Sequence, residues 1–260
     1  MSKQSAISGL ALPRAADGDS QIGRAFIGLR EMILHGELAR GERISELPLV
    51  GRLGTSRTPI RLALERLAHM GLLDVLPNGG FAVRGFTLAE ALDAIELRGV
   101  LEGTAARFAA ERLREESELT VMRDACTRME ALGSLTIDTF EVYMDLNESF
   151  HAALTDLAHS AILQRHIAQV SSLPFASASA MVFPTSVLPN ADAHLLIANA
   201  QHRSIIEAVA QRQSARAEGL AREHAHLARR VLSVAMSNTD AMRRIPGAPL
   251  IHVETVRAAG

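Results

Sequence analysis

Three histidines and one asparagine in the second half of the chain have the residue types and spacing of a metal site. Asn147 and His151 are four residues apart in a helical segment, so their side chains project from the same face. His202 and His224 fall in the last two helical segments. Imidazoles from three facing helices, together with one oxygen donor, are what a helical bundle needs to bind a divalent cation. We therefore predict a site formed by Asn147, His151, His202 and His224, although a histidine at any one of these positions, taken alone, is more often structural.

Two further residues, Arg98 and Tyr143, could complete a ligand pocket beside such a cation. A cation with an open coordination position attracts carboxylates, and Arg98 could hold the same carboxylate through two parallel hydrogen bonds. An ion pair with Glu102, four residues later, is the alternative for Arg98, and the sequence leaves both open. Tyr143 precedes Asn147 by four residues and shares its helix face, where it could line the pocket floor.

A metal-dependent hydrolase using the same histidines is the alternative function. Hydrolysis needs a general base beside the metal. The nearest carboxylate in the sequence, Glu148, is one residue past Asn147 and about 100° off the ligand face. His226 is two residues past His224 and would point about 160° away, so it is not expected to be a ligand. No His-Glu-x-x-His, Gly-x-Ser-x-Gly or phosphate-loop motif occurs. We therefore expect that the protein is not an enzyme. A scaffold that serves only for dimerisation is a further alternative.

The first part of the chain shows the element order of a winged helix-turn-helix. Apolar spacing and glycine stops predict helices over Gln21–His35, over Glu46–Leu53 and from Arg57 to about Gly71. A hairpin follows, with strands around Leu73–Val75 and Phe81–Val83 and a turn at Pro77–Gly80. Any small helical domain could contain part of this order.

In a winged helix-turn-helix, the N-terminal residues of the recognition helix reach base edges in the major groove. Arg57 and Arg61 lie one turn apart on the polar face of the third helix, and arginine bonded to guanine is the commonest specific contact. Thr58 could bond a phosphate or a base edge. Gly80, in the hairpin turn, could approach the minor groove or the backbone. We predict that these residues bind double-stranded DNA.

From Thr87 onward the chain is predicted to be entirely helical, so the fold class is mainly α, with a winged helix-turn-helix followed by an all-helical bundle. The predicted helices are Thr87–Leu113, Ser117–Leu132, Thr136–Leu157, Ala161–Met181, Ala191–Arg212 and Ser214–Met236. The domains are then a flexible segment at 1–20, a DNA-binding domain at 21–86, an effector-binding and dimerisation domain at 87–236, and a frayed tail at 237–260.

Composition fits a two-domain protein of a reducing cytoplasm. The 260 residues suffice for two domains, and aromatic residues make up only 3%, which suits helices built from Leu, Ala, Ile and Val. The first 86 residues carry 11 Lys/Arg against 8 Asp/Glu, and the rest carry 16 against 21. A mildly basic DNA reader on an acidic body has this distribution. The lone Cys126 fits a reducing compartment, and no apolar run approaches the roughly 18 residues of a membrane span.

Several stretches resemble the GntR family of bacterial regulators. The most specific is Ser56-Arg57-Thr58-Pro59-Ile60-Arg61. It is supported by Leu29–Leu38, Gly41–Glu46, Ala63-Leu64, Arg66-Leu67 and Gly71–Leu73. Glu96-Leu97-Arg98, Leu101-Glu102-Gly103 and Ala105-Ala106-Arg107 resemble the opening helix of the FCD-type domain, which defines the FadR branch of that family. The resemblance covers about residues 22–236, with Pro48 and Gly51 as departures in the second helix.

The resemblance implies a homodimeric transcription regulator, with repression expected, whose operator binding is controlled by a small carboxylic acid. It implies that Arg57, Thr58 and Arg61 contact DNA. It also implies one divalent metal ion per chain, with zinc expected and nickel or manganese possible alternatives. Many relatives have a carboxylate where this chain has Asn147, so weaker metal binding is expected. Pro174–Ala180 with Arg222–Ala225 looks like the branch of vanillate-type regulators, which suggests an aromatic acid as the effector.

Overall fold

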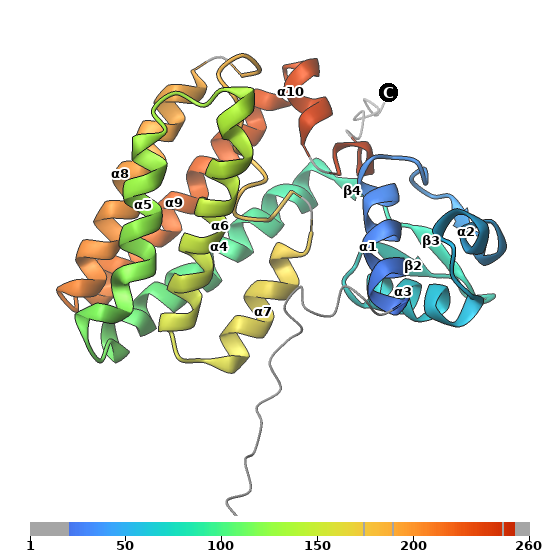
Figure 1. Ribbon diagram of the computed structural model, residues 1–260, viewed down its shortest axis with the longest axis horizontal. Coiled ribbons are helices and arrows are strands. Elements are labelled where there is room, and N and C mark those ends of the chain that lie inside the picture. The colour runs from blue at the N-terminus through green and yellow to red at the C-terminus, as the bar shows by residue number, and fades with distance from the viewer. Residues whose placement is uncertain (1–20, 174, 189, 246, 253–260) are drawn as a thin grey trace, which may run out of the picture.

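The protein is described by a computed structural model of residues 21–173, 175–188, 190–245 and 247–252, which form a small N-terminal domain and a larger helical bundle (Figure 1). The segment 1–20, expected to be flexible, lies outside the described residues. Among the residues that are described, no helix has both the length and the apolar character needed to cross a membrane.

The N-terminal domain is a winged helix-turn-helix with nearly the predicted boundaries. Its elements in chain order are α1 (Gln21–Leu34), β1 (Arg43–Ile44), α2 (Glu46–Leu53), α3 (Arg57–His69), β2 (Leu73–Val75) and β3 (Phe81–Val83). Buried aliphatic residues at helical spacing join α1 to α3: Leu29, Ile33, Ile60, Leu64 and Leu67. Pro48 and Gly51 do not interrupt α2, which ends where Gly54 takes a left-handed conformation with φ of 60°.

The strands form an antiparallel sheet in the order β1-β3-β2. The sequence had predicted only the hairpin of β2 and β3; β1 lies between the first two predicted helices, where no strand was predicted. At the hairpin turn, Gly79 and Gly80 have φ values of 79° and 86°, a conformation that side chains with a Cβ rarely adopt. The turn closes through a hydrogen bond from the Leu76 N–H to the Gly80 carbonyl. The tip of the wing therefore consists of two glycines, whose backbone is not covered by side chains.

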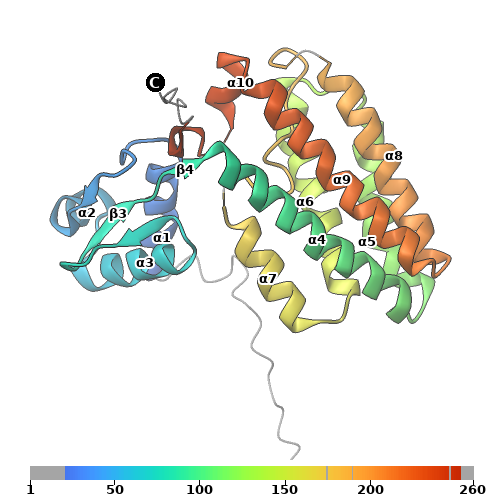
Figure 2. The same ribbon diagram turned by 180° about the vertical axis from the view of Figure 1, so that it is seen from behind.

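The helical domain surrounds one long central helix. After β4 (Phe86–Thr87), the chain forms α4 (Leu88–Arg112), η2 (Glu116–Leu119), α5 (Thr120–Ala131), α6 (Ile137–Leu157), α7 (Ala161–Ser171), α8 (Ala191–Ala210) and α9 (Ser214–Ala235). Thr87 caps α4 reciprocally with Glu90. Helix α4 contacts α6, α7, α8 and α9, and it lies alongside α9 over much of its length (Figure 2).

Two glycines allow α4 and α9 to approach closely. A Cβ built at Gly99 would lie 2.6 Å from the Cβ of Ala225, and one at Gly103 would lie 2.6 Å from the Cγ of Arg222. This close packing places the middle of α4 directly against the middle of α9, where Arg98, Glu102 and His224 reside.

One predicted helix is too long. The segment Ala161–Met181 was expected to be helical throughout, but α7 ends at Ser171 and turns follow. Proline at position 174 supplies the reason, because it lacks an N–H and disfavours helical geometry in the residue before it. The irregular segment that follows still contributes to the core through buried Phe175, Met181 and Phe183.

The prediction of a frayed tail at 237–260 is also wrong for the described residues up to 252. The chain forms α10 (Thr239–Arg244), η3 (Ala248–Leu250) and β5 (Ile251–His252), and β5 pairs in parallel with β4. Periodicity does not reveal this segment because its elements are short and are stabilised by packing: Leu250 is buried, and η3 contacts α1. One hydrophobic cluster thus runs through both domains, from α1 and α3 to α9 and η3.

Candidate metal centre and DNA-binding face

The three predicted histidines meet in the centre of the bundle. His151 comes from α6, His202 from α8 and His224 from α9, and one nitrogen of each lies within 4.8 Å of the others. The Nε2 atoms of His202 and His224 are 3.2 Å apart. His151 and His202 are buried, and His224 is partly accessible because it lines a cavity.

The hydrogen bonds of these rings leave nitrogen atoms available as ligands. Nδ1 of His224 lies 3.0 Å from the amide oxygen of Gln201, so this nitrogen carries the proton and Nε2 presents a lone pair towards His202. Both ring nitrogens of His151 and the Nδ1 of His202 are buried without a hydrogen-bond partner in the described part of the chain, although Nδ1 of His151 lies at ion-pair distance from Glu102. Buried polar atoms are rarely left unpaired, because each costs about 1–3 kcal/mol.

These residues fit a metal ion. Metal–imidazole bonds of about 2.1 Å place two ligand nitrogens at most about 4.2 Å apart, so small ring movements would bring all three within bonding range. Burial is the main cause that lowers the pKa of His202 and of His224, the latter to about 3. The rings of His202 and His224 are therefore neutral at physiological pH, which is the form that binds metals.

A carboxylate that the sequence did not single out stands behind the histidines. Glu102 on α4 is 3% exposed, and its Oε1 lies 3.2 Å from Nδ1 of His151 and 3.3 Å from Nη1 of Arg98. Burial opposes ionisation of Glu102, but the charge of Arg98, followed by His151, outweighs it and lowers the pKa to about 2. An ionised carboxylate behind a ligating imidazole fixes its orientation and raises its basicity.

The expectation that Glu148 is the carboxylate nearest to this site is therefore wrong. Glu148 lines a separate cavity with Arg30 and Phe140, whereas Glu102 contacts His151 through the packing of α4 against α6. The spacing of Arg98 and Glu102 indicated their ion pair, but the sequence gave no sign that His151 would join it. His226 lies 3.8 Å from Glu96 and is not one of the clustered histidines, as expected.

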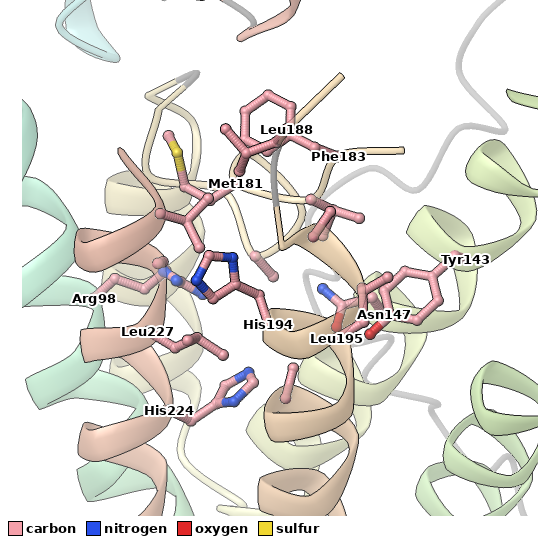
Figure 3. Close-up of a pocket in the computed structure, with 16 residues that line it drawn as sticks. Arg98, Tyr143, Asn147, Met181, Phe183, Leu188, His194, Leu195, His224 and Leu227 are labelled. Carbon is pink, nitrogen blue, oxygen red and sulfur yellow. The ribbon is translucent and has the colours of Figure 1, made fainter. Parts of the chain in front are cut away.

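A cavity opens beside the histidines (Figure 3). The cavity is narrow and partly open to solvent, so it would have to widen to admit a ligand. The polar residues that line it are Arg98, Tyr143, Asn147, His194 and His224; most of the others are aliphatic.

The structure brings the remaining predicted site residues to this cavity. Arg98 both forms the ion pair with Glu102 and lines the cavity, and its Nε has no hydrogen-bond partner within the described ranges. Both roles considered for Arg98 are thus geometrically compatible. Asn147 donates a hydrogen bond from Nδ2 to Ser179 Oγ at 3.2 Å, which leaves its amide oxygen as an acceptor. Tyr143 donates to Asn199 at 2.9 Å, and burial raises its pKa.

The predicted DNA-contacting residues are exposed on α3 and the wing. Arg57, Thr58 and Arg61 are all exposed, on the face opposite the buried side of α3. Arg61 forms an exposed ion pair with Glu65 at 3.4 Å, which contributes little stability and can be exchanged for another partner. Gly80 is exposed at the tip of the wing.

Comparison with protein families agrees with both parts of this architecture. A family described as bacterial regulatory proteins of the gntR family matches residues 23–83, and the FCD domain matches residues 93–227. The chain belongs to the GntR family and carries an FCD domain. The match to the FCD domain begins inside α4 and ends inside α9, so it includes all three histidines.

Curated relatives of this GntR protein carry regulator names. The Nta operon transcriptional regulator of Aminobacter aminovorans is 34% identical over 50% of this chain and 60% of its own length. The HTH-type transcriptional repressor RspR of Escherichia coli K12 is 29% identical over 50% of this chain and 56% of its own length. The chain thus matches little more than half the length of these relatives.

Solved structures support the fold. Escherichia coli McbR/YncC superposes with a TM-score of 0.58 at 18% identity, covering 84% of this chain and 98% of that one. A structure titled for Lar, which controls the Listeria monocytogenes agr system, has a TM-score of 0.58 at 19% identity, with 83% and 98% covered. The chain thus shares the two-domain arrangement of these proteins.

Proposed function

We propose that this protein is a DNA-binding transcriptional repressor whose operator affinity is lowered by a small carboxylic acid. The observation that carries the proposal is the cavity in the FCD domain. It is lined by His224, one of the three clustered imidazoles, and by Arg98, whose Nε has no partner in the described part of the chain. The regulator and repressor names of the relatives favour the same function. Because its target would be operator DNA, we place the protein in the bacterial cytoplasm.

We propose that His151, His202 and His224, assisted by the amide oxygen of Asn147, hold one divalent cation per chain. Zinc is the first candidate, with nickel or manganese as alternatives. When bound, the cation supplies positive charge that attracts a carboxylate. None of the four donors is an anionic side chain, so binding should be weaker than at a site with a carboxylate or thiolate ligand.

Arg98 is proposed to hold the effector's carboxylate with its free Nε and the adjacent Nη2 while Nη1 stays with Glu102. Tyr143 lines the same cavity with its phenol protonated. The aliphatic walls favour an acid with an apolar body, which is consistent with an aromatic acid such as those of the vanillate type.

Helix α4 offers the route from the cavity to DNA. It carries Arg98 and Glu102 in its middle and begins directly after the wing, where Arg84 forms a 3.0 Å ion pair with Glu90. An effector shifts DNA binding only by its differential affinity for the DNA-competent and incompetent dimers. A coupling free energy of about 1–3 kcal/mol would change DNA affinity about 5- to 150-fold.

The proposal is tested by metal analysis and by screening small carboxylic acids against metal-replete protein for thermal stabilisation. His202→Ala and Arg98→Ala are compared with His226→Ala, a histidine variant of α9 outside the cluster. We expect bound metal in wild type and in His226→Ala, its loss in His202→Ala, and loss of acid binding in Arg98→Ala. If wild type holds no metal after refilling with zinc, nickel or manganese, the metal site is refuted. If His202→Ala and Arg98→Ala both bind the acid as tightly as wild type, the effector site lies elsewhere.

A further inference from the structure

One histidine in the cavity has no role in the metal site. His194 on α8 lines the cavity, and its Nδ1 is buried without a hydrogen-bond partner within the described ranges. In Figure 3 its ring projects from α8 towards the side of α9. An imidazole nitrogen can donate or accept a hydrogen bond, so this buried atom needs a partner that the described residues do not provide.

His194 lies between His224 and the apolar end of the cavity, which is lined by Met181, Phe183 and Leu188 (Figure 3). It precedes His202 by eight residues on the same helix, which corresponds to about 12 Å along the axis. Leu195 and Ala198 line the cavity between the two. Helix α9 runs antiparallel to α8 after a short turn, and its lining residues continue in the same direction from His224 to Val231.

The cavity therefore has polar groups at two levels along its length. His224 and Asn147 lie at one level and His194 lies at the other, while the walls include Leu195 and Leu227. A simple fatty or benzoic acid would pair with the first level and leave the Nδ1 of His194 unpaired. A ligand with a second polar group could pair with both levels.

We propose that His194 selects the effector, which is an acid with an apolar body and a hydroxyl or second carboxylate separated from its first carboxylate. The inference rests on the proposed function, because it assumes that an acid binds in this cavity. His194 is a specificity-determining residue in this account, and the cation, Arg98 and the walls hold the rest of the ligand.

Calorimetric titration of the metal-replete, full-length protein tests this with matched pairs of probes: 4-hydroxybenzoate against benzoate, and glutarate against pentanoate. Wild type should prefer the member with the second polar group in at least one pair by about threefold to tenfold, the worth of one net hydrogen bond. His194→Leu should lose that preference and bind the simpler acid with unchanged affinity. His194→Gln, which keeps a hydrogen-bonding group, should retain part of it.

His166→Leu is the control, since His166 is exposed on α7 and outside this cavity. Circular dichroism of each variant checks that the fold is intact. If wild type and His194→Leu show the same ratio of affinities in both pairs, the inference is overturned while the acid-binding function stands. If no probe or other screened acid binds the metal-replete wild type, the proposed function itself fails.

Discussion

Helix α4 contains two ion pairs of the same spacing, one buried behind the histidines and one exposed to solvent. Arg98 and Glu102 are four residues apart with a 3.3 Å ion pair, and Arg107 and Glu111 have the same spacing and the same 3.3 Å distance. The side chains of the first pair are 2% and 3% exposed, and those of the second are 36% and 42% exposed. We predict that Glu102→Gln is strongly destabilising and that Glu111→Gln is nearly neutral.

The magnitude follows from burial. Removing one partner of a buried ion pair leaves an uncompensated charge and costs about 3–5 kcal/mol. An exposed pair on a helix contributes about 0.5 kcal/mol or less, and Arg107 also retains Glu218 at 3.2 Å. For a domain of this size, the loss in Glu102→Gln corresponds to a Tm lower by about 6–20 °C. Glu102→Gln should also weaken metal binding about 10- to 100-fold, because His151 loses its carboxylate partner.

The assay is urea unfolding of the metal-free variants, followed by zinc titration against a competing chelator. Glu111→Gln serves as the matched control on the same helix. If Glu102→Gln loses no more stability than Glu111→Gln, the Arg98 charge is solvated in the folded protein. The description of Glu102 as an ionised, buried partner of both Arg98 and His151 would then be wrong.

Three other predictions concern packing, pH and DNA. Gly219→Ala should stabilise the protein by about 1 kcal/mol, because a Cβ there meets nothing within 4 Å. Gly99→Ala should be less stable than Gly219→Ala by about 1–3 kcal/mol, as measured by thermal melts, because its Cβ overpacks against α9; equal stabilities would contradict the close approach of α4 and α9. The lowered pKa of His224 means that its contribution to metal-free stability is complete above the unfolded-state pKa of about 6.5 and falls as pH drops from there towards 3. The loss by pH 5.5 should reach up to about 1.4 kcal/mol in urea melts, and an absence of any loss would show that the ring is protonated in the folded state. Arg57→Ala and Arg61→Ala should each reduce affinity for a selected operator by about 1–3 kcal/mol and for random duplex much less, measured by fluorescence anisotropy; equal losses on both DNAs would mean phosphate contacts only.

Features set by local sequence were predicted well. The apolar spacing of Leu29 and Ile33, the stop at Gly54 and the start at Arg57 are encoded within a few residues, and the observed helices α1, α2 and α3 follow them closely. The clustering of His151, His202 and His224 was also predicted, because helix faces and a bundle architecture suffice to bring them together.

Features set by contacts between distant segments were not predicted. Glu102 reaches His151 only because α4 packs against α6, and nothing in its neighbourhood of the sequence encodes that contact. The pairing of β5 with β4 joins residues more than 160 positions apart, and each strand is too short to show a period. The proposed role of His194 likewise depends on the shape of the cavity. Its position in the sequence does not set it apart from the other histidines.

The central claim is that an acid bound beside the three histidines controls DNA binding. The direct test is a fluorescence anisotropy titration of an operator selected by enrichment from random duplexes. It is performed with zinc-loaded and chelator-treated wild type and with His202→Ala, each with and without an acid identified by thermal shift. We predict that the acid lowers the operator affinity of zinc-loaded wild type about 5- to 150-fold and leaves the chelated protein and His202→Ala unaffected. An equal effect of the acid on all three proteins would contradict the account.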